Sequence, residues 1–450
     1  MNTLFSDKIF YHIYPLGFCN CPKKNDFVSP RGYAFEKLTE ELDKIKSLGI
    51  NALYIGPIFE STAHGYDTLD YFHVDRRLGN NQSFAAFCDE CHNRGIAVVL
   101  DAVFNHTGRH FFAFRDLQEK GRNSQYKDWY LNVDFSRKSC FGDSFDYEGW
   151  AGCKDLVKLN LENQEVRNHL FSAVDFWIDT FKIDGLRLDA ADVISKRFLK
   201  ALSNHCKNKK ADFWLMGEVV HGDYNDWINQ GELDSVTNYQ IYKSLWSAFN
   251  DKNLFELSYN LNREFGEGGM YKSFLPYNFL DNHDVNRLGS TIKNTKHLFL
   301  LYDLLFLIPG IPSIYYGSEF GIRGARNNQG DFELRPSLPP FSQIPDFAKP
   351  FVDSDALCET ISRFAKLRQN QIALQLGNYK EVSITNETLA FERTFYGEKI
   401  IVAINSSEEE KEVYIEKNHS DVENLLTGEK MYCDGKILVA GNGIFVGKVI

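Results

Sequence analysis

The sequence contains no run of 18 apolar residues, which is about the length that a transmembrane helix needs. Its first ten residues also lack the apolar stretch of a signal peptide, and they include the charged residues Asp7 and Lys8. From these two absences we expect a cytoplasmic protein with no membrane partner.

The chain also lacks a cluster of basic residues. It has 50 Lys and Arg against 61 Asp and Glu, which gives a formal net charge of −11. Proteins that bind nucleic acid present a positive surface to the phosphate backbone, so this charge balance argues against a nucleic-acid partner. It says little about a neutral substrate.

The cysteines form neither an obvious metal site nor a disulfide framework. They number nine, and the pairs Cys88/Cys91 and Cys19/Cys21 each lack a second matched pair. A zinc site is the less favoured alternative, and reduced, buried thiols of a cytosolic protein are favoured. With 450 residues the chain can bury a large core without such links.

The two common nucleotide-binding motifs are missing as well. Neither G-x-G-x-x-G between a strand and a helix nor G-x-x-x-x-G-K-[ST] occurs, which removes the main reason to expect a dinucleotide-binding sheet. Instead, short apolar runs alternate with amphipathic stretches. The expected strands are 9–14, 52–55, 96–100, 185–188, 212–216, a weak one near 236, 274–280 and 312–316.

Amphipathic segments with helical spacing of their apolar residues lie between these strands. The expected helices are 33–48, 83–93, 164–181, 193–205, helices within 239–264, 295–307 and 357–371. Eight strand–helix units of this kind predict an α/β protein built on a (β/α)8 TIM barrel.

Two stretches depart from this alternation. Residues 105–159 are polar and aromatic, show no clear helix period and are too long for a simple loop, so we expect an inserted subdomain after the third strand. From about residue 376 the pattern changes to period two, which is typical of an antiparallel β domain. The predicted division is a catalytic barrel over 1–104 and 160–372, subdomain 105–159 and a C-terminal β-sandwich over 373–450.

Acidic residues follow the predicted strands in a common register. The set consists of Asp101, Asp189, Glu218 and Asp284, accompanied by Arg187, His106 and His283. The carboxyl ends of barrel strands form the rim on which (β/α)8 enzymes carry their active sites, so these side chains are expected to converge. Arg187 and Asp189 are two positions apart on one strand and therefore share a face.

Clustered carboxylates beside an arginine fit two chemistries, glycoside hydrolysis and divalent-metal catalysis. Arg187 favours the first, because a guanidinium keeps Asp189 ionised as a nucleophile requires and is a poor neighbour for a metal ion. Glu218 follows the apolar run Trp214 to Met216, and burial there would raise its pKa as a general acid requires.

Four short motifs surround these residues. They are D-A-V-F-N-H at 101–106, G-L-R-L-D-A at 185–190, G-E-V at 217–219 and F-L-D-N-H-D at 279–284. The segments K-L-N at 158–160 and G-I-P-S-I-Y-Y-G at 310–317 add weaker support. In this order, and each at a strand end, the motifs resemble those of the α-amylase family of glycoside hydrolases, and the resemblance covers the whole chain.

The resemblance implies a role for each matching acid. Asp189 would be the nucleophile that forms a covalent glycosyl-enzyme, and Glu218 would be the general acid and base. Asp284 would hold two hydroxyl groups of the sugar and help distort its ring. These roles imply retention of configuration, for which the carboxyls of Asp189 and Glu218 lie about 5–5.5 Å apart.

The resemblance implies supporting roles for five other residues. His106 and His283 would hydrogen-bond the same sugar, and Tyr66 would stack under it. Arg187 would orient the nucleophile, and Asp101 would have a structural role.

Departures from the family pattern concern calcium. Many calcium-binding α-amylases continue the second motif with Lys-His, whereas this chain has Asp192 and Val193. Asn105 remains a candidate calcium ligand, although a loop asparagine bonded to its own backbone is the favoured alternative. The resemblance therefore implies no required cofactor and leaves calcium open.

The branch of the family is also left open. K-L-N at 158–160 and G-E-V-V-H at 217–221 look more like cyclomaltodextrinases and neopullulanases. That branch usually carries an extra N-terminal domain, whereas the first strand here begins by residue 9. In that branch the extra domain supports dimerisation, so the sequence leaves the oligomeric state open as well.

We therefore predict a retaining hydrolase of α-1,4-glucosidic bonds whose partner is an α-glucan oligosaccharide, such as a maltooligosaccharide or a starch fragment. The alternatives within the family are a cyclomaltodextrinase- or neopullulanase-type hydrolase and an α-glucanotransferase, which would share every catalytic residue. Two alternatives have a different function: a sugar-binding protein on an inactive barrel, and a metal-dependent hydrolase on the same kind of barrel. The intact set of acids argues against the inactive barrel.

Overall fold

The computed structural model describes residues 3–328, 330–338, 345–416 and 421–450. Its central sheet has eight parallel strands, one for each strand predicted from the sequence. In chain order these are β1 (Phe10–Ile13), β2 (Ala52–Ile55), β5 (Ala97–Ala102), β9 (Gly185–Leu188), β10 (Trp214–Gly217), β11 (Ser235–Val236), β12 (Tyr277–Phe279) and β13 (Ile311–Tyr315).

The sheet curls until its two end strands meet. The strand order is β11-β10-β9-β5-β2-β1-β13-β12. Directly after β11, Thr237 forms a parallel bridge with Tyr277 of β12, and the backbone N–H of Asn238 donates to the Tyr277 carbonyl at 2.9 Å. The predicted (β/α)8 barrel is therefore confirmed.

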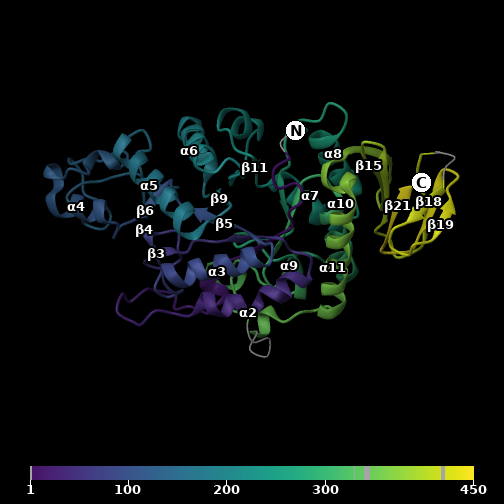
Figure 1. Cartoon of the computed structure of the whole chain (residues 1–450), viewed down its shortest axis with the longest axis horizontal. Helices are drawn as coiled ribbons and strands as arrows, with labels where there is room; N and C mark the ends of the chain where they lie inside the picture. The colour runs from purple at the N-terminus through teal and green to yellow at the C-terminus, as the bar shows by residue number, and fades with distance from the viewer. Residues whose placement is uncertain (1–2, 329, 339–344, 417–420) are drawn as a thin grey trace.

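Helices cover the outside of the barrel between successive strands (Figure 1). Side chains of Asn163, Ser195 and Asn294 cap three of them by accepting backbone N–H groups of the first turn. The main helices are α2 (Ala34–Ser47), α3 (Asn81–Asn93), α5 (Gln164–Phe181), α6 (Lys196–Lys209), α7 (Tyr239–Asn250), α8 (Leu254–Phe265), α10 (Thr295–Leu307) and α11 (Ser354–Asn370). Short helices are α1 (Pro15–Phe18), α9 (Leu288–Thr291) and α12 (Ile372–Leu376).

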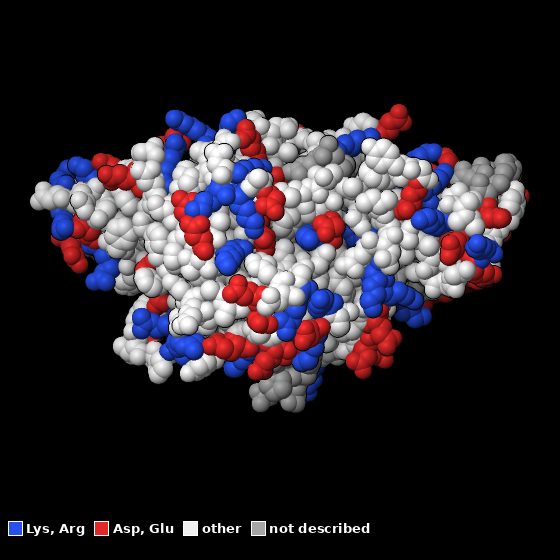
Figure 2. Space-filling view, viewed as in Figure 1, with Lys and Arg blue, Asp and Glu red and all other residues white. Residues whose placement is uncertain are grey.

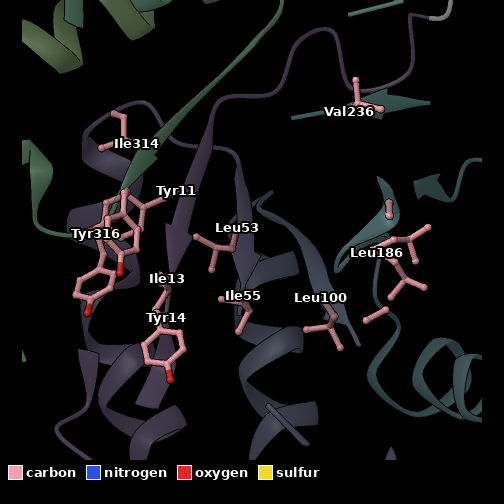
Figure 3. Packing of buried hydrophobic residues seen from close by; sticks show 14 of the residues in the cluster. Tyr11, Ile13, Tyr14, Leu53, Ile55, Leu100, Leu186, Val236, Ile314 and Tyr316 are labelled. Atoms are coloured by element: carbon pink, nitrogen blue, oxygen red, sulfur yellow. The ribbon is translucent and has the colours of Figure 1, made fainter. Parts of the chain in front are cut away.

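The barrel strands bury both of their faces. Alternate residues such as Phe10, Tyr54 and Trp214 fill the interior, where the ring centroids of Phe10 and Trp214 lie 5.2 Å apart. The intervening residues, among them Leu53 and Leu100, belong to the cluster between sheet and helices that Figure 3 shows. Burial on both faces explains why these strands are nearly continuous apolar runs in the sequence.

The stretch after the third barrel strand contains regular structure that the sequence pattern does not reveal. Strands β6 (His106–Gly108), β7 (Gly149–Trp150) and β8 (Cys153–Lys158) form a small antiparallel sheet, and α4 (Phe112–Lys120) is accompanied by 3-10 turns at Gly121–Asn123 and Lys127–Trp129. These elements lie at one end of the molecule (Figure 1). A hairpin of β3 (Phe59–Ser61) and β4 (Thr68–Val74) precedes them.

The C-terminal strands form an antiparallel sheet at the other end of the molecule (Figure 1). Its order is β14 (Asn378–Ile384), β15 (Thr388–Phe395), β16 (Glu398–Asn405), β21 (Gly443–Val449), β18 (Asp421–Asn424) and β19 (Lys430–Tyr432), with β17 (Lys411–Tyr414) and β20 (Lys436–Val439) as a separate pair. Arg393 on β15 is fully buried and donates to the Leu307 carbonyl at 2.6 Å, which joins this sheet to the barrel.

Three further features concern the hydropathy of the helices, the surface charge and the cysteines. No helix within the described ranges is long and apolar enough to cross a membrane. Figure 2 shows acidic and basic side chains interspersed over the face in view. Cys88 and Cys91 on α3 are fully buried in the main core cluster, where they pack as small apolar side chains.

Candidate active site

A cavity of about 920 Å³ opens at the carboxyl ends of the barrel strands. Five of the residues singled out in the sequence line it: Tyr66, His106, Asp189, Glu218 and Asp284. The other three, Asp101, Arg187 and His283, are buried directly behind this wall, each 2 % exposed or less. The fold therefore brings the predicted side chains together around one cavity.

Arg187 on β9 is the centre of the acidic cluster. Its Nη1 lies 2.8 Å from Asp101 Oδ1 and 2.9 Å from Asp189 Oδ1, and its Nη2 lies 2.6 Å from Glu218 Oε1. One guanidinium thus contacts three carboxylates that come from three neighbouring strands.

Strand register explains this convergence. Asp101 of β5 pairs with Arg187 of β9, and Met216 of β10 pairs with Arg187 from the other side. Glu218, two residues beyond Met216, therefore extends toward the same space. The backbone N–H of Ala190, a residue with a left-handed φ of 47°, donates to Glu218 Oε2 at 2.9 Å and fixes the second oxygen.

The electrostatic environments of the two central carboxyls are more alike than the sequence suggests. The sequence pattern placed Arg187 beside Asp189 and apolar residues around Glu218, whereas both carboxyls contact the same guanidinium. Burial raises the pKa of Asp189 and of Glu218 above their ordinary values, and Arg187 opposes the rise at both. Two buried carboxyls that share one cation titrate as a pair.

Tyr66, His283 and Asp284 form a second connected group. The Tyr66 hydroxyl donates to Asp101 Oδ2 at 3.0 Å and lies 2.5 Å from His283 Nε2, and the same nitrogen lies 3.0 Å from Asp284 Oδ2. The rings of Tyr66 and His283 are stacked with centroids 5.5 Å apart. Asp101 therefore holds both Arg187 and Tyr66 in place, which supports a structural role.

His106 on β6 contributes a neutral ring to the cavity wall. Its Nε2 lies 3.1 Å from the Tyr66 carbonyl, and burial lowers its pKa to about 4. At neutral pH the ring is therefore uncharged, and Nε2 acts as the donor to that carbonyl. This arrangement fixes His106 against the segment that carries Tyr66.

Asn105 shows little fit to a calcium site. It is 1 % exposed, and its Nδ2 lies 3.2 Å from His106 Nδ1. Within the described ranges, no group of three or more His, Cys, Asp or Glu side chains is placed to hold a metal ion. Because calcium takes about six to eight oxygen ligands, usually including carboxylates, the residues here do not fit it and we derive no step through a metal.

Two further residues of the cavity come from segments to which the sequence assigned no individual contacts. Arg335, from the loop after β13, donates from Nη2 to Asp284 Oδ1 at 2.9 Å and lies over the Tyr14 ring at 4.7 Å. Trp150 from β7 lines the cavity beside His106, with ring centroids 5.9 Å apart. Arg335 lies in a loop and Trp150 in a two-residue strand, and the local sequence pattern does not fix where either segment runs in the fold.

Removing the Arg335 side chain should raise the pKa of Asp284 and lower the activity. Although burial raises the pKa of Asp284, His283 and Arg335 lower it more and keep it below its usual range. We expect Arg335→Ala to reduce kcat/KM about tenfold, because one charge-assisted contact is worth about 1.4 kcal/mol here. The acid limb of the pH–rate profile should move to higher pH, since the Asp284 pKa rises.

Arg323→Ala is the matched control, because Arg323 is exposed in the same loop and donates to the Lys349 carbonyl. Steady-state kinetics over a pH series measure both effects. A wild-type acid limb in Arg335→Ala would contradict the assigned influence on Asp284.

The comparisons with known proteins agree with this geometry. The family model described as the catalytic domain of alpha amylase matches residues 12–365. The chain is 30% identical over 459 residues to a cyclomaltodextrinase of Geobacillus thermopakistaniensis, over 96% of this chain and 74% of that protein. It is also 30% identical to neopullulanase 2 of Thermoactinomyces vulgaris, over 95% of this chain and 74% of that protein.

A solved structure resembles the whole molecule. It is the cyclic alpha-maltosyl-(1→6)-maltose hydrolase of Arthrobacter globiformis in its ligand-free form, with a TM-score of 0.84 and 28% sequence identity. The superposition covers 100% of both chains. With the barrel, the acidic cluster and a family match over most of the chain, the protein belongs to the α-amylase family of glycoside hydrolases.

Proposed function

We propose that this enzyme hydrolyses α-1,4-glucosidic bonds of maltooligosaccharides and starch-derived glucans with retention of configuration. The observation that carries the proposal is the single guanidinium of Arg187 in contact with both Asp189 and Glu218 at the cavity wall. A retaining glycosidase needs one carboxylate and one carboxylic acid close together, and a pair that titrates as a unit supplies both.

In the reactive form Asp189 is ionised and Glu218 holds the proton. A carboxylate oxygen of Asp189 attacks the anomeric carbon while Glu218 protonates the departing glycosidic oxygen, which leaves a covalent glycosyl-enzyme. Glu218, now a carboxylate, takes a proton from water, and the resulting attack on the anomeric carbon releases Asp189. Each displacement inverts the anomeric carbon, so the net result is retention.

The other cavity residues are assigned to the sugar at the cleaved bond. We propose that Asp284 and His106 bind its hydroxyl groups, that Tyr66 stacks under its ring and that His283, predicted from the sequence as a direct hydroxyl ligand, positions Tyr66 and Asp284 instead. Tyr66, His106 and Asp284 line the cavity, which supports these roles. His283 acts from behind, since its Nε2 contacts both Tyr66 and Asp284.

A cyclic substrate is the second candidate. The names of the similar cyclomaltodextrinase and cyclic maltosyl-maltose hydrolase contain cyclic glucans, and that of the similar neopullulanase contains pullulan. The chain also aligns with an intracellular maltogenic amylase of Bacillus subtilis at 29% identity over 82% of its residues. We propose that this enzyme acts in the cytoplasm. We also propose that the catalytic barrel comprises residues 1–104 and 160–372, the inserted subdomain residues 105–159 and the C-terminal β domain residues 373–450.

Product analysis tests the proposal. Maltoheptaose, cyclodextrins, pullulan, isomaltose, sucrose and starch are each incubated with the purified enzyme, and the products are separated by chromatography. We expect shorter maltooligosaccharides of α configuration from maltoheptaose. Products longer than the substrate would identify a glucanotransferase, and no turnover of any α-1,4-glucan would overturn the proposal.

A further inference from the structure

One edge of the active-site cavity is formed by two loops that are far apart in the sequence. Pro22 and Lys23 follow helix α1, while Asp331, Phe332 and Arg335 follow strand β13. All five line the cavity. The two loops approach each other on the side of the cavity where Arg335 contacts Asp284.

The exposed side chains of Lys23 and Phe332 bring the two loops into contact. The ammonium nitrogen of Lys23 lies 3.9 Å from the ring centroid of Phe332, in cation–π geometry. Phe332 remains 51% exposed, so the pair stands in solvent at the mouth of the cavity. This Lys23–Phe332 rim contact connects the two loops at the edge of the cavity.

An ion pair lies next to this contact in each loop, a buried one beside Lys23 and an exposed one beside Phe332. Arg77 pairs with Asp75 at 2.7 Å and donates to the Pro22 carbonyl at 3.1 Å, directly before Lys23. On the other side, Arg326 Nε lies 2.5 Å from Asp331 Oδ1, directly before Phe332. The backbone beside Lys23 is therefore anchored by a buried ion pair, whereas the backbone beside Phe332 has an exposed one.

We infer that the Lys23–Phe332 rim contact limits how many sugar units the cleft binds beyond Arg335, and so favours short glucans over long ones. This inference rests on the proposed activity toward α-1,4-glucans. A chain that continues past Arg335 must part the two side chains. An exposed cation–π contact is weak, so the penalty for a long glucan is about two- to fivefold.

The test compares maltotriose with maltoheptaose. The ratio of kcat/KM for the longer to the shorter sugar is measured for wild type, Phe332→Ala, Lys23→Ala and the double variant. We expect each single change to raise this ratio about two- to fivefold, and the double variant to raise it no further, because both remove the same contact. Phe332→Tyr keeps an aromatic face and should keep the wild-type ratio.

Tyr33→Ala is the matched control. The Arg31 guanidinium lies 4.6 Å from the exposed Tyr33 ring, so this variant removes a similar cation–π pair in the same N-terminal region. Its ratio should equal that of wild type. An unchanged ratio in Phe332→Ala, or an equal rise in Tyr33→Ala, overturns the inference. A lower ratio in Phe332→Ala would make Phe332 a stacking surface for long glucans and would also overturn it.

Binding measurements separate this inference from the proposed function. Asp189→Asn serves as an inactive background, and calorimetry gives the Kd ratio of the two sugars with and without Phe332→Ala. If wild type hydrolyses neither sugar, the proposed function fails and the Kd ratio alone decides the rim contact. If neither sugar binds, both proposals fail.

Discussion

Asp189→Ala is expected to lose about 10⁴-fold or more in kcat toward maltooligosaccharides, because no other group can replace the attacking carboxylate. Asp189 is the carboxylate that combines exposure to the cavity with a 2.9 Å contact to Arg187 Nη1. The variant should still bind maltooligosaccharides, since the proposed sugar contacts of Tyr66, His106 and Asp284 remain.

External azide distinguishes this role from that of Glu218. With an aryl α-maltoside, whose leaving group needs no proton, azide can occupy the space left in Asp189→Ala and attack the anomeric carbon once. A single displacement gives the β-maltosyl azide. In Glu218→Ala the glycosyl-enzyme still forms and azide attacks it, so two displacements give the α-azide. Nuclear magnetic resonance of the azide products measures the configuration.

The matched control for Asp189 is Asp346→Ala, which changes an exposed aspartate whose Oδ1 lies 2.6 Å from Lys349 Nζ. Its kcat should equal that of wild type. If Asp189→Ala gives an α-azide, or if Asp189→Ala turns over maltooligosaccharides as fast as wild type, another group forms the covalent bond.

Arg187→Met is expected to reduce activity and to destabilise the fold by about 3 kcal/mol or more, because it leaves buried carboxylates without their cation. Arg187 is 2% exposed and contacts Asp101, Asp189 and Glu218. Methionine preserves much of the side-chain volume, so the loss reports on charge and hydrogen bonding more than on packing.

The destabilisation should depend on pH in a defined direction. In wild type, Arg187 lowers the pKa of Asp189 and of Glu218 against the rise caused by burial. Without it both values rise further above those of the unfolded chain. A carboxyl whose folded-state pKa is raised favours folding at low pH and loses that contribution as the pH rises through the folded value. The free energy of unfolding should therefore fall more steeply with pH in Arg187→Met.

Urea unfolding at about pH 5.5 and about pH 8 measures this difference. Arg187→Lys is the comparison variant, because it keeps the charge but cannot contact three carboxylates with one planar group. It should recover part of the stability and little of the activity. An equal loss of stability at both pH values in Arg187→Met would contradict the charge argument.

Much of the barrel follows from local sequence. Helix 164–181, strand 185–188 and helix 295–307 have the predicted bounds, because apolar periodicity, capping residues and short buried runs act over a few residues. The small sheet and helix α4 within 105–159 were not predicted in detail, since this polar and aromatic stretch lacks the apolar runs that mark the barrel strands.

The active site also has a part that the sequence predicts and a part that only the tertiary structure shows. The sequence by itself determined which acids follow strands, and the closed barrel with its fixed register makes those residues meet. Only the tertiary structure decided that Arg187 serves Asp189 and Glu218 together, that Arg335 reaches Asp284, and that Lys23 meets Phe332. These contacts join segments far apart in the chain, and they depend on where loops travel after each strand. Local propensity and spacing contain no information about that path.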